Sequence, residues 1–78
     1  MTLKIISTDQ IEFEGTVKAV TLPGVMGSFQ VLQNHAALIA ALKAGTMSYT
    51  TDDDKAVTRE IFGGVADIKD NVVSVCIY

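Results

Sequence analysis

The sequence predicts a single all-β domain over residues 1–78, folded as a β-sandwich or a flattened barrel. Its 78 residues suffice for one hydrophobic core and not for two. Apolar residues alternate with polar ones, for example at Val17 and Ala19, and this period is typical of strands with one buried face. Turn-forming residues recur at short intervals and divide the chain into roughly eight to ten short strands, a spacing that indicates a sandwich or barrel.

The first third of the chain is expected to form three strands. Residues 3–7 and 11–14 make the first two, joined by the polar turn Thr8-Asp9-Gln10. Gly15 then interrupts the alternation, which indicates a β-bulge or a sharp bend. Such a bend would allow residues 16–22 to cross to another sheet.

A loop, a short strand and a turn follow Pro23-Gly24, which ends the third strand. The loop and the short strand occupy residues 25–32, and Gln33-Asn34 favours a turn. Residues 36–43 have the alanine and leucine content of a helix, but the segment is short and has no convincing cap at Ala44-Gly45. We therefore expect a strand there, preceded by a loop.

A hairpin and a final strand pair complete the domain. The strands are expected at residues 46–51, 56–62, 65–68 and 72–78. Thr, Tyr, Val and Ile favour the two hairpin strands, on either side of the tip Asp52-Asp53-Asp54-Lys55. Gly63-Gly64 is expected to open the last strand pair, and the polar run Lys69-Asp70-Asn71 suits the tight reversal within it.

The composition disfavours some classes of partner and favours another. Six basic against nine acidic residues give a net charge of −3 without a cluster of Lys or Arg, which disfavours nucleic acid. Hydrophobic residues make up 49% of the chain, so part of the apolar surface is expected to meet another protein. No stretch approaches the roughly 20 apolar residues of a membrane span, so any membrane association is expected to be indirect.

The single cysteine and the single histidine, Cys76 and His35, give little support for catalysis. One cysteine allows neither an intrachain disulfide nor a cysteine-based zinc site, and it fits a reducing cytosol. Cys76 with His35 is the only Cys/His pair available to a nucleophilic enzyme, but no basic neighbour activates the thiol. We expect a structural or interface role for His35, with its ring bonded to a loop carbonyl or to a partner.

The acidic residues also have an ordinary explanation. Glu12 and Glu14 could in principle divide acid and base roles, but Ile11 and Phe13 are expected on the buried face, which leaves both acids on the solvated one. The run Asp52–Asp54 could hold a cation, but Lys55 follows it directly, and a solvated turn explains it better. We therefore expect no catalytic residue, no metal site and no cofactor.

Several ordered segments together resemble one family, the epsilon subunit of the bacterial F-type ATP synthase. The segments are Phe13-Glu14-Gly15, Val20-Thr21-Leu22-Pro23-Gly24, Gly27-Ser28-Phe29-Gln30-Val31-Leu32, His35-Ala36-Ala37-Leu38, Ala41-Leu42-Lys43-Ala44-Gly45, Phe62-Gly63-Gly64-Val65 and Asn71-Val72-Val73-Ser74-Val75. The resemblance covers essentially the whole chain and corresponds to the family's N-terminal domain, a ten-stranded β-sandwich. The family's C-terminal helical hairpin has no counterpart here, so its inhibitory and ATP-binding roles are not expected.

The resemblance implies a rotor subunit with no catalysis of its own. In the family this domain joins the gamma subunit to the ring of c subunits, so that proton-driven rotation of the ring turns the central stalk and powers ATP synthesis. It implies a peripheral position at the cytoplasmic face of the bacterial inner membrane, held only through the ATP synthase complex.

The resemblance also assigns candidate contact residues. The loop Gly24, Val25, Met26, Gly27, Ser28 and Phe29 matches the segment that faces the c-ring, with Ser28 where the family often has an acid. His35, Ser7 and Ala40 match the gamma interface. Gln33-Asn34 replaces the family's proline-glycine before His35, and Asn34 tolerates the left-handed conformation that glycine would adopt.

Two alternatives stay open beside the rotor subunit. One is a small β-barrel that serves as a scaffold or binds a metabolite, which would require a ligand-sized cavity. The other is a minimal hydrolase that uses Cys76 or the Glu12 and Glu14 pair.

Overall fold

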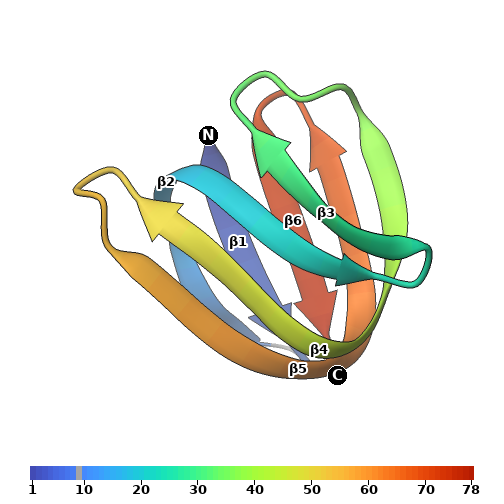
Figure 1. The fold of residues 1–78 in the computed structure, drawn as a ribbon. Coiled ribbons are helices and arrows are strands. Elements are labelled where there is room, and N and C mark those ends of the chain that lie inside the picture. Colours follow the sequence, from blue (N-terminus) through green and yellow to red (C-terminus); the bar gives the residue numbers. More distant parts are fainter. Residues whose placement is uncertain (9) are drawn as a thin grey trace.

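The computed structural model of the protein describes residues 1–8 and 10–78 and contains six β-strands in that part (Figure 1). The strands are β1 (Thr2–Ser7), β2 (Gln10–Gly24), β3 (Gly27–Leu32), β4 (Leu38–Thr51), β5 (Ala56–Lys69) and β6 (Val72–Ile77). The all-β class is thus confirmed, and within residues 36–43 the part from Leu38 onward belongs to a strand and not to a helix. Asp9, in the middle of the expected turn at residues 8–10, lies outside the described residues. No helix in the described ranges is long and apolar enough to cross a membrane.

The expected ten strands are wrong, because each of the three long strands joins two segments that were expected to be separate. β2 runs through Gly15, β4 runs through Gly45, and β5 runs through Gly63-Gly64. Glycine lets a strand bend sharply without ending. A single long strand can therefore contribute its first half to one layer and its second half to the other, as the curved strands in Figure 1 show.

The strands form one closed sheet with an additional strand at its margin. The order is β1-β6-β5-β4-β2-β3, and a further pairing between β1 and β2 closes it. β2 pairs with β1 up to Thr16 and with β4 from Val17 onward. The chain was expected to cross to another sheet after Gly15; it does change its pairing partner after Thr16, but it stays within the one sheet.

The β-bulge lies three residues before the expected position. Ile5 pairs with Phe13 while Ile6 pairs with Ile11, which leaves Glu12 as the extra residue of β2. At Gly15 the pairing with β1 is regular. A bulge reverses the alternation of faces, so Phe13 packs against the core whereas Ile11 is exposed. The expected burial of Ile11 was wrong for this reason.

The turns use residues that tolerate positive φ. Asp70 and Asn71, with φ of 52° and 65°, form the two-residue connection between β5 and β6, as a type I′ hairpin turn requires. Asn34 has a φ of 62°, which confirms the left-handed conformation expected from the sequence. The reversal at residues 69–71 is confirmed as well.

Gly64 shows why the glycine pair lies inside a strand. Its φ is +157°, and a Cβ atom there would overlap the carbonyl oxygen of Cys76 on β6. Only glycine lets β5 and β6 approach this closely. The pair therefore does not open a new strand, as the sequence suggested, but bends an existing one.

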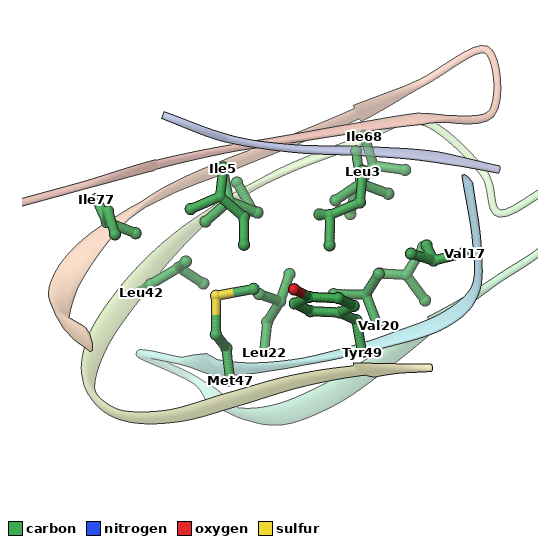
Figure 2. Close-up of a cluster of buried hydrophobic side chains, with 14 of the residues drawn as sticks. Leu3, Ile5, Val17, Val20, Leu22, Leu42, Met47, Tyr49, Ile68 and Ile77 are labelled. Atoms are coloured by element: carbon green, nitrogen blue, oxygen red, sulfur yellow. The ribbon is translucent and has the colours of Figure 1, made fainter. Parts of the chain in front are cut away.

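The core lies between the two layers and is entirely apolar in the described part of the chain (Figure 2). Met47 and Tyr49 of β4 point across it toward Leu3 and Ile5 of β1. Its buried residues are Met1, Leu3, Ile5, Val17, Val20, Leu22, Val31, Leu42, Met47, Tyr49, Ile61, Ala66, Ile68, Val73, Val75 and Ile77. Because no polar or charged residue among those described is buried, their polar side chains are available for contacts on the outer surface.

Candidate interaction surface

An apolar groove lies between the β2–β3 hairpin and the start of β4. It has a volume of about 610 Å³, and its lining residues are Gly24, Val25, Met26, Gly27, Ser28, Phe29, Leu38, Ile39, Ala40 and Ala41. One wall is the whole loop that the sequence assigned to the c-ring. The other wall contains Ala40, which the sequence assigned to gamma. We call this feature the edge groove.

The closed end of the edge groove is fixed by backbone contacts. Gly24 pairs with Leu42 of β4, and the Val25 amide donates to the Ala41 carbonyl at 2.9 Å. A Cβ atom on Gly24 would lie 2.7 Å from the Gly27 carbonyl oxygen and 2.9 Å from the Phe29 ring. The hairpin is therefore held against β4, and the sequence requires glycine at this point because backbone and ring leave no room for a side chain.

The lining of the edge groove carries no charged side chain. Met26 at its rim is 99% exposed and Ile39 on the opposite wall is 72% exposed. Isolated exposed apolar residues are common on proteins, but several around one hollow indicate a contact surface. The edge groove is thus suited to an uncharged, apolar partner.

His35 lies at the far end of the edge groove, in the segment that connects β3 to β4. Its amide donates to the Leu32 carbonyl at 3.2 Å, and the Asn34 amide donates to Asn71 Oδ1 at 2.9 Å. The ring Nδ1 donates to the Ala36 carbonyl at 2.7 Å, as a carbonyl can only accept. The expected bond from the ring to a loop carbonyl is therefore present, and it orients the imidazole.

Ser7 lies far from His35. Asn71, which bonds to the turn of His35, also bonds to Thr2 at the start of β1. Ser7 is five residues further along β1, beside Ile77, which corresponds to about 17 Å of strand. Of the three residues assigned to gamma, Ala40 thus lies in the edge groove, His35 at its end, and Ser7 at the opposite end of the domain.

Glu12 is part of a charged contact and not of an acid–base pair. The Ser7 hydroxyl and the Arg59 guanidinium, both hydrogen bonded to Glu12, hold the pKa of its carboxyl below the ordinary value. Glu12 and Arg59 form an ion pair, which links the bulge of β2 to the first half of β5. Glu14, in contrast, pairs in register with Lys4 of β1. The two acids therefore have different partners, which does not suit a shared catalytic role.

Cys76 is exposed on β6 and is not close to His35. It lies five residues along the strand from Asn71, which corresponds to about 17 Å, whereas the turn of His35 bonds to Asn71 itself. A nucleophile and its base need hydrogen-bond contact. The Cys/His pair therefore has no catalytic geometry.

The acidic tip is engaged by lysines. Lys18 Nζ lies 2.6 Å from an Asp54 carboxylate oxygen, and Lys55 Nζ lies 3.8 Å from Asp53. The hydrogen bond and the negative charge of Asp54 raise the pKa of Lys18 above its ordinary value. Across the described residues, no three His, Cys, Asp or Glu side chains are grouped so that they could hold a metal ion.

The sequence analysis did not predict two parts of the surface. The Leu38–Ala41 wall was assigned to a strand, and only Ala40 in it was considered a contact; the lack of any charge from Ala36 to Leu42 was the available signal. The second is an aromatic corner, in which Phe62 and Tyr78 are 81% and 82% exposed. No local pattern distinguishes that corner from a buried strand end.

Comparison with known proteins identifies a family. The model of the ATP synthase delta/epsilon chain β-sandwich domain matches residues 1–77. The ATP synthase epsilon chain of Chlorobaculum tepidum is 39% identical over 70 residues, which are 90% of this chain and 80% of the relative. The epsilon chain of Rickettsia bellii is 39% identical over 75 residues, or 94% of this chain and 69% of the relative.

Solved structures agree with this relationship. A chain in the Euglena gracilis mitochondrial ATP synthase, in a structure of OSCP, F1 and c-ring, superimposes with a TM-score of 0.91 at 25% identity over 96% of this chain. A chain in the central stalk and c-ring structure of the Tetrahymena thermophila enzyme superimposes with a TM-score of 0.81 at 11% identity over 97% of this chain, which supports the fold alone. The protein spans 48% and 61% of these two chains.

Proposed function

The chain belongs to the family of the ATP synthase delta/epsilon chain β-sandwich domain, and from this premise we propose that it is a non-catalytic epsilon subunit of the central stalk. In this role it couples the gamma subunit to the c-ring, so that proton-driven rotation of the ring turns the stalk of the proton-translocating ATP synthase. The observation that carries the proposal is the family match over residues 1–77, supported by epsilon chains among the relatives.

The fold suits the transmission of torque. Closure of the sheet by the pairing of β1 with β2 makes a stiff body, because most strands have hydrogen-bonded neighbours on both sides. The buried apolar side chains of the core resist compression, because close-packed protein interiors have low compressibility. A small rigid body with contact surfaces at different places can hold two partners in a fixed relation.

We assign the two partners to different parts of the surface. The loop Gly24–Phe29 faces the c-ring, where backbone groups and the Ser28 hydroxyl supply hydrogen bonds. Gamma contacts Ser7, His35 and Ala40. Since these three residues are spread along the domain, gamma would have to cover one long side of it. The protein would then be peripheral at the cytoplasmic face of the bacterial inner membrane, held through the complex.

A co-purification experiment tests this function. With the protein as bait, we expect capture of both the gamma subunit and the c-ring from reconstituted components. His35→Ala should weaken capture of gamma, whereas Ser28→Ala should weaken capture of the c-ring and leave gamma unchanged. The proposal is lost if the unaltered chain binds neither partner and does not co-purify with detergent-extracted ATP synthase.

The edge groove supports one alternative, a module that binds a small apolar metabolite. Its volume of about 610 Å³ lies in the roughly 300–1,000 Å³ range of ligand sites. Thermal-shift screening of apolar metabolites against the free protein separates the two functions. A ligand that raises Tm in wild type but not in Phe29→Ala, together with no binding to gamma or the c-ring, would favour the metabolite.

A further inference from the structure

The edge groove is bordered by two strand edges that lack a neighbouring strand. Within the described ranges, β3 pairs only with β2. The first half of β4 pairs with β5 on one side, and on the other side it contacts only the end of the β2–β3 hairpin. The edges meet at Gly24 and Leu42 and are connected at their far ends by residues 33–37 (Figure 1). The opening between them is the edge groove.

Hairpin geometry shows which backbone groups of β3 face this opening. The two-residue loop makes Gly24 and Gly27 a hydrogen-bonded pair, and hydrogen-bonded and non-hydrogen-bonded pairs alternate from there. Ser28 and Gln30 therefore direct their amides and carbonyls away from β2. The proline at position 23, opposite Ser28, agrees with this phase because it has no N–H to donate. The Leu32 carbonyl agrees too, since it accepts from His35 outside the sheet.

The facing edge of β4 also has backbone groups that point toward the opening. The Ala41 carbonyl accepts from the Val25 amide, so it points away from β5. Residues two apart in a strand direct their backbone groups to the same side, and Ile39 therefore also directs its amide and carbonyl toward the opening. The edge groove thus offers unpaired backbone donors and acceptors on both walls, together with apolar side chains.

Neither edge carries the features that normally prevent strand pairing. Natural edge strands are protected by lysine, proline or inward-pointing charges, whereas β3 reads Gly-Ser-Phe-Gln-Val-Leu and β4 begins Leu-Ile-Ala-Ala. The protein does use charge elsewhere, at the Asp52–Lys55 tip. An unprotected, uncharged edge beside an apolar hollow matches one kind of occupant, an extended and uncharged peptide segment that adds a strand.

We infer that an extended, uncharged segment of a neighbouring stalk subunit pairs with the free edge of β3 and places alternate apolar side chains in the edge groove. This inference rests on the proposed function, because it takes its partner from the assembled stalk. The Ser28 and Gln30 amides and carbonyls bond to the segment. Phe29, Leu38 and Ile39 contact its side chains, and the absence of charge on both walls excludes a charged segment.

Hydrogen exchange on the assembled complex tests the strand pairing. Residue-resolved exchange is compared between the free protein and its complex with gamma and the c-ring. The Ser28 and Gln30 amides should exchange about 100-fold more slowly in the complex, at the rate of a ladder amide. A helix or loop bound over the groove would cover the side chains without this protection, and unchanged rates at both amides would overturn the inference.

A proline substitution supplies the matched binding test. Gln30→Pro removes an outward N–H and leaves the pairing with β2 intact, whereas Gln30→Ala keeps the N–H. We expect the proline variant to bind the partner about tenfold more weakly than the alanine variant, with folding of both checked by NMR. Equal binding would contradict the inference even where the complex forms. Failure of the unaltered protein to form any complex would remove the proposed function, and this inference with it.

Discussion

The β4–β5 tip and the edge groove are both built on hairpin turns. Polar groups of the tip have partners within the chain, whereas backbone groups beside the edge groove are unpaired. At the tip, the Thr51 amide donates to the Lys55 carbonyl at 2.9 Å and the Asp54 amide donates to the Thr51 carbonyl at 3.0 Å. Lys18 contacts the Asp54 carboxylate. At the edge groove no side chain is charged, Met26 projects into solvent, and strand edges are left unpaired.

The difference shows where the domain is complete and where it is not. A turn whose amides and charges find partners within the chain needs nothing further, and its aspartates keep it soluble. Uncharged edges and exposed apolar side chains are stabilised only when another surface covers them. The tip is therefore a solvated end of the molecule, and the edge groove is the part that an assembly would complete.

The largest expected effect is a loss of stability when one methyl group is added at the closed end of the edge groove. In Gly24→Ala the new Cβ would overlap the Gly27 carbonyl and the Phe29 ring. We expect a loss of about 1–3 kcal/mol in the free energy of unfolding, the usual cost of overpacking. Urea denaturation measures it. The tip variant Asp54→Gly, which removes a side chain from a residue at φ 64°, should change stability by no more than about 0.5 kcal/mol.

Gly15→Ala is the matched control for Gly24→Ala. Its new Cβ would meet only the end of the Phe13 ring, at 3.0 Å, and a side chain can move where a backbone carbonyl cannot. It should cost clearly less than Gly24→Ala. If the two alanine variants were equally destabilised, the closed end of the edge groove would not be the tightly packed joint that the geometry indicates.

The next effect concerns binding and leaves stability unchanged. Met26 is 99% exposed, so Met26→Ser should alter the free energy of unfolding by less than about 0.5 kcal/mol. Its burial by a partner contributes about 1.5–3 kcal/mol, so we expect the affinity for the assembled stalk to fall at least about tenfold. Titration calorimetry with gamma and the c-ring measures this. Asp53→Asn at the tip should bind the stalk with the affinity of the wild type. If Asp53→Asn weakened binding and Met26→Ser did not, the tip and not the edge groove would be the contact surface.

The sequence was sufficient for the parts of the fold that depend on local chemistry. Alternation located the strands, and the reversals at residues 69–71 and at Asn34 follow from residues that tolerate positive φ. The strand count was not accessible in this way. A glycine that ends a strand and a glycine that bends one look alike in sequence, and the Gly64 contact with Cys76 depends on residues twelve apart in the chain.

The candidate site was predicted in part for a similar reason. The loop Gly24–Phe29 was identified through family resemblance, and it forms one wall of the edge groove. The opposite wall, Leu38–Ala41, comes from a strand whose free edge only the sheet order reveals. The position of Ser7, far from His35, likewise depends on the register of β1 and β6 and not on any local pattern.

The next prediction concerns the loss of stability in acid, and it falls outside both regions, on the ion pair between Glu12 and Arg59. The pKa of the Glu12 carboxyl is lowered from 4.5 by hydrogen bonds from Ser7 and Arg59, whereas none of the residues that line the edge groove is ionisable. A lowered pKa in the folded state gives stability that is present above pH 4.5 and is lost as the pH falls through the folded-state value. The Tm advantage of wild type over Glu12→Gln should therefore shrink between pH 7 and pH 3. A constant difference would show that the charge of Glu12 does not contribute.

The smallest effect is expected at the tip itself, because Lys18 and Asp54 are largely exposed, with side chains 49% and 77% accessible. The hydrogen bond to Asp54 raises the pKa of Lys18 above 10.5, so the contribution of the pair is present below pH 10.5 and is lost as the pH rises through the folded-state value. Lys18→Gln should lower Tm only slightly at neutral pH, and the difference should vanish in about 1 M salt, where exposed charges are screened. The affinity of Lys18→Gln for the assembled stalk should match wild type. A weakened complex would instead mean that a partner covers the tip. The tip would then be a contact surface like the edge groove and not a solvated end of the molecule.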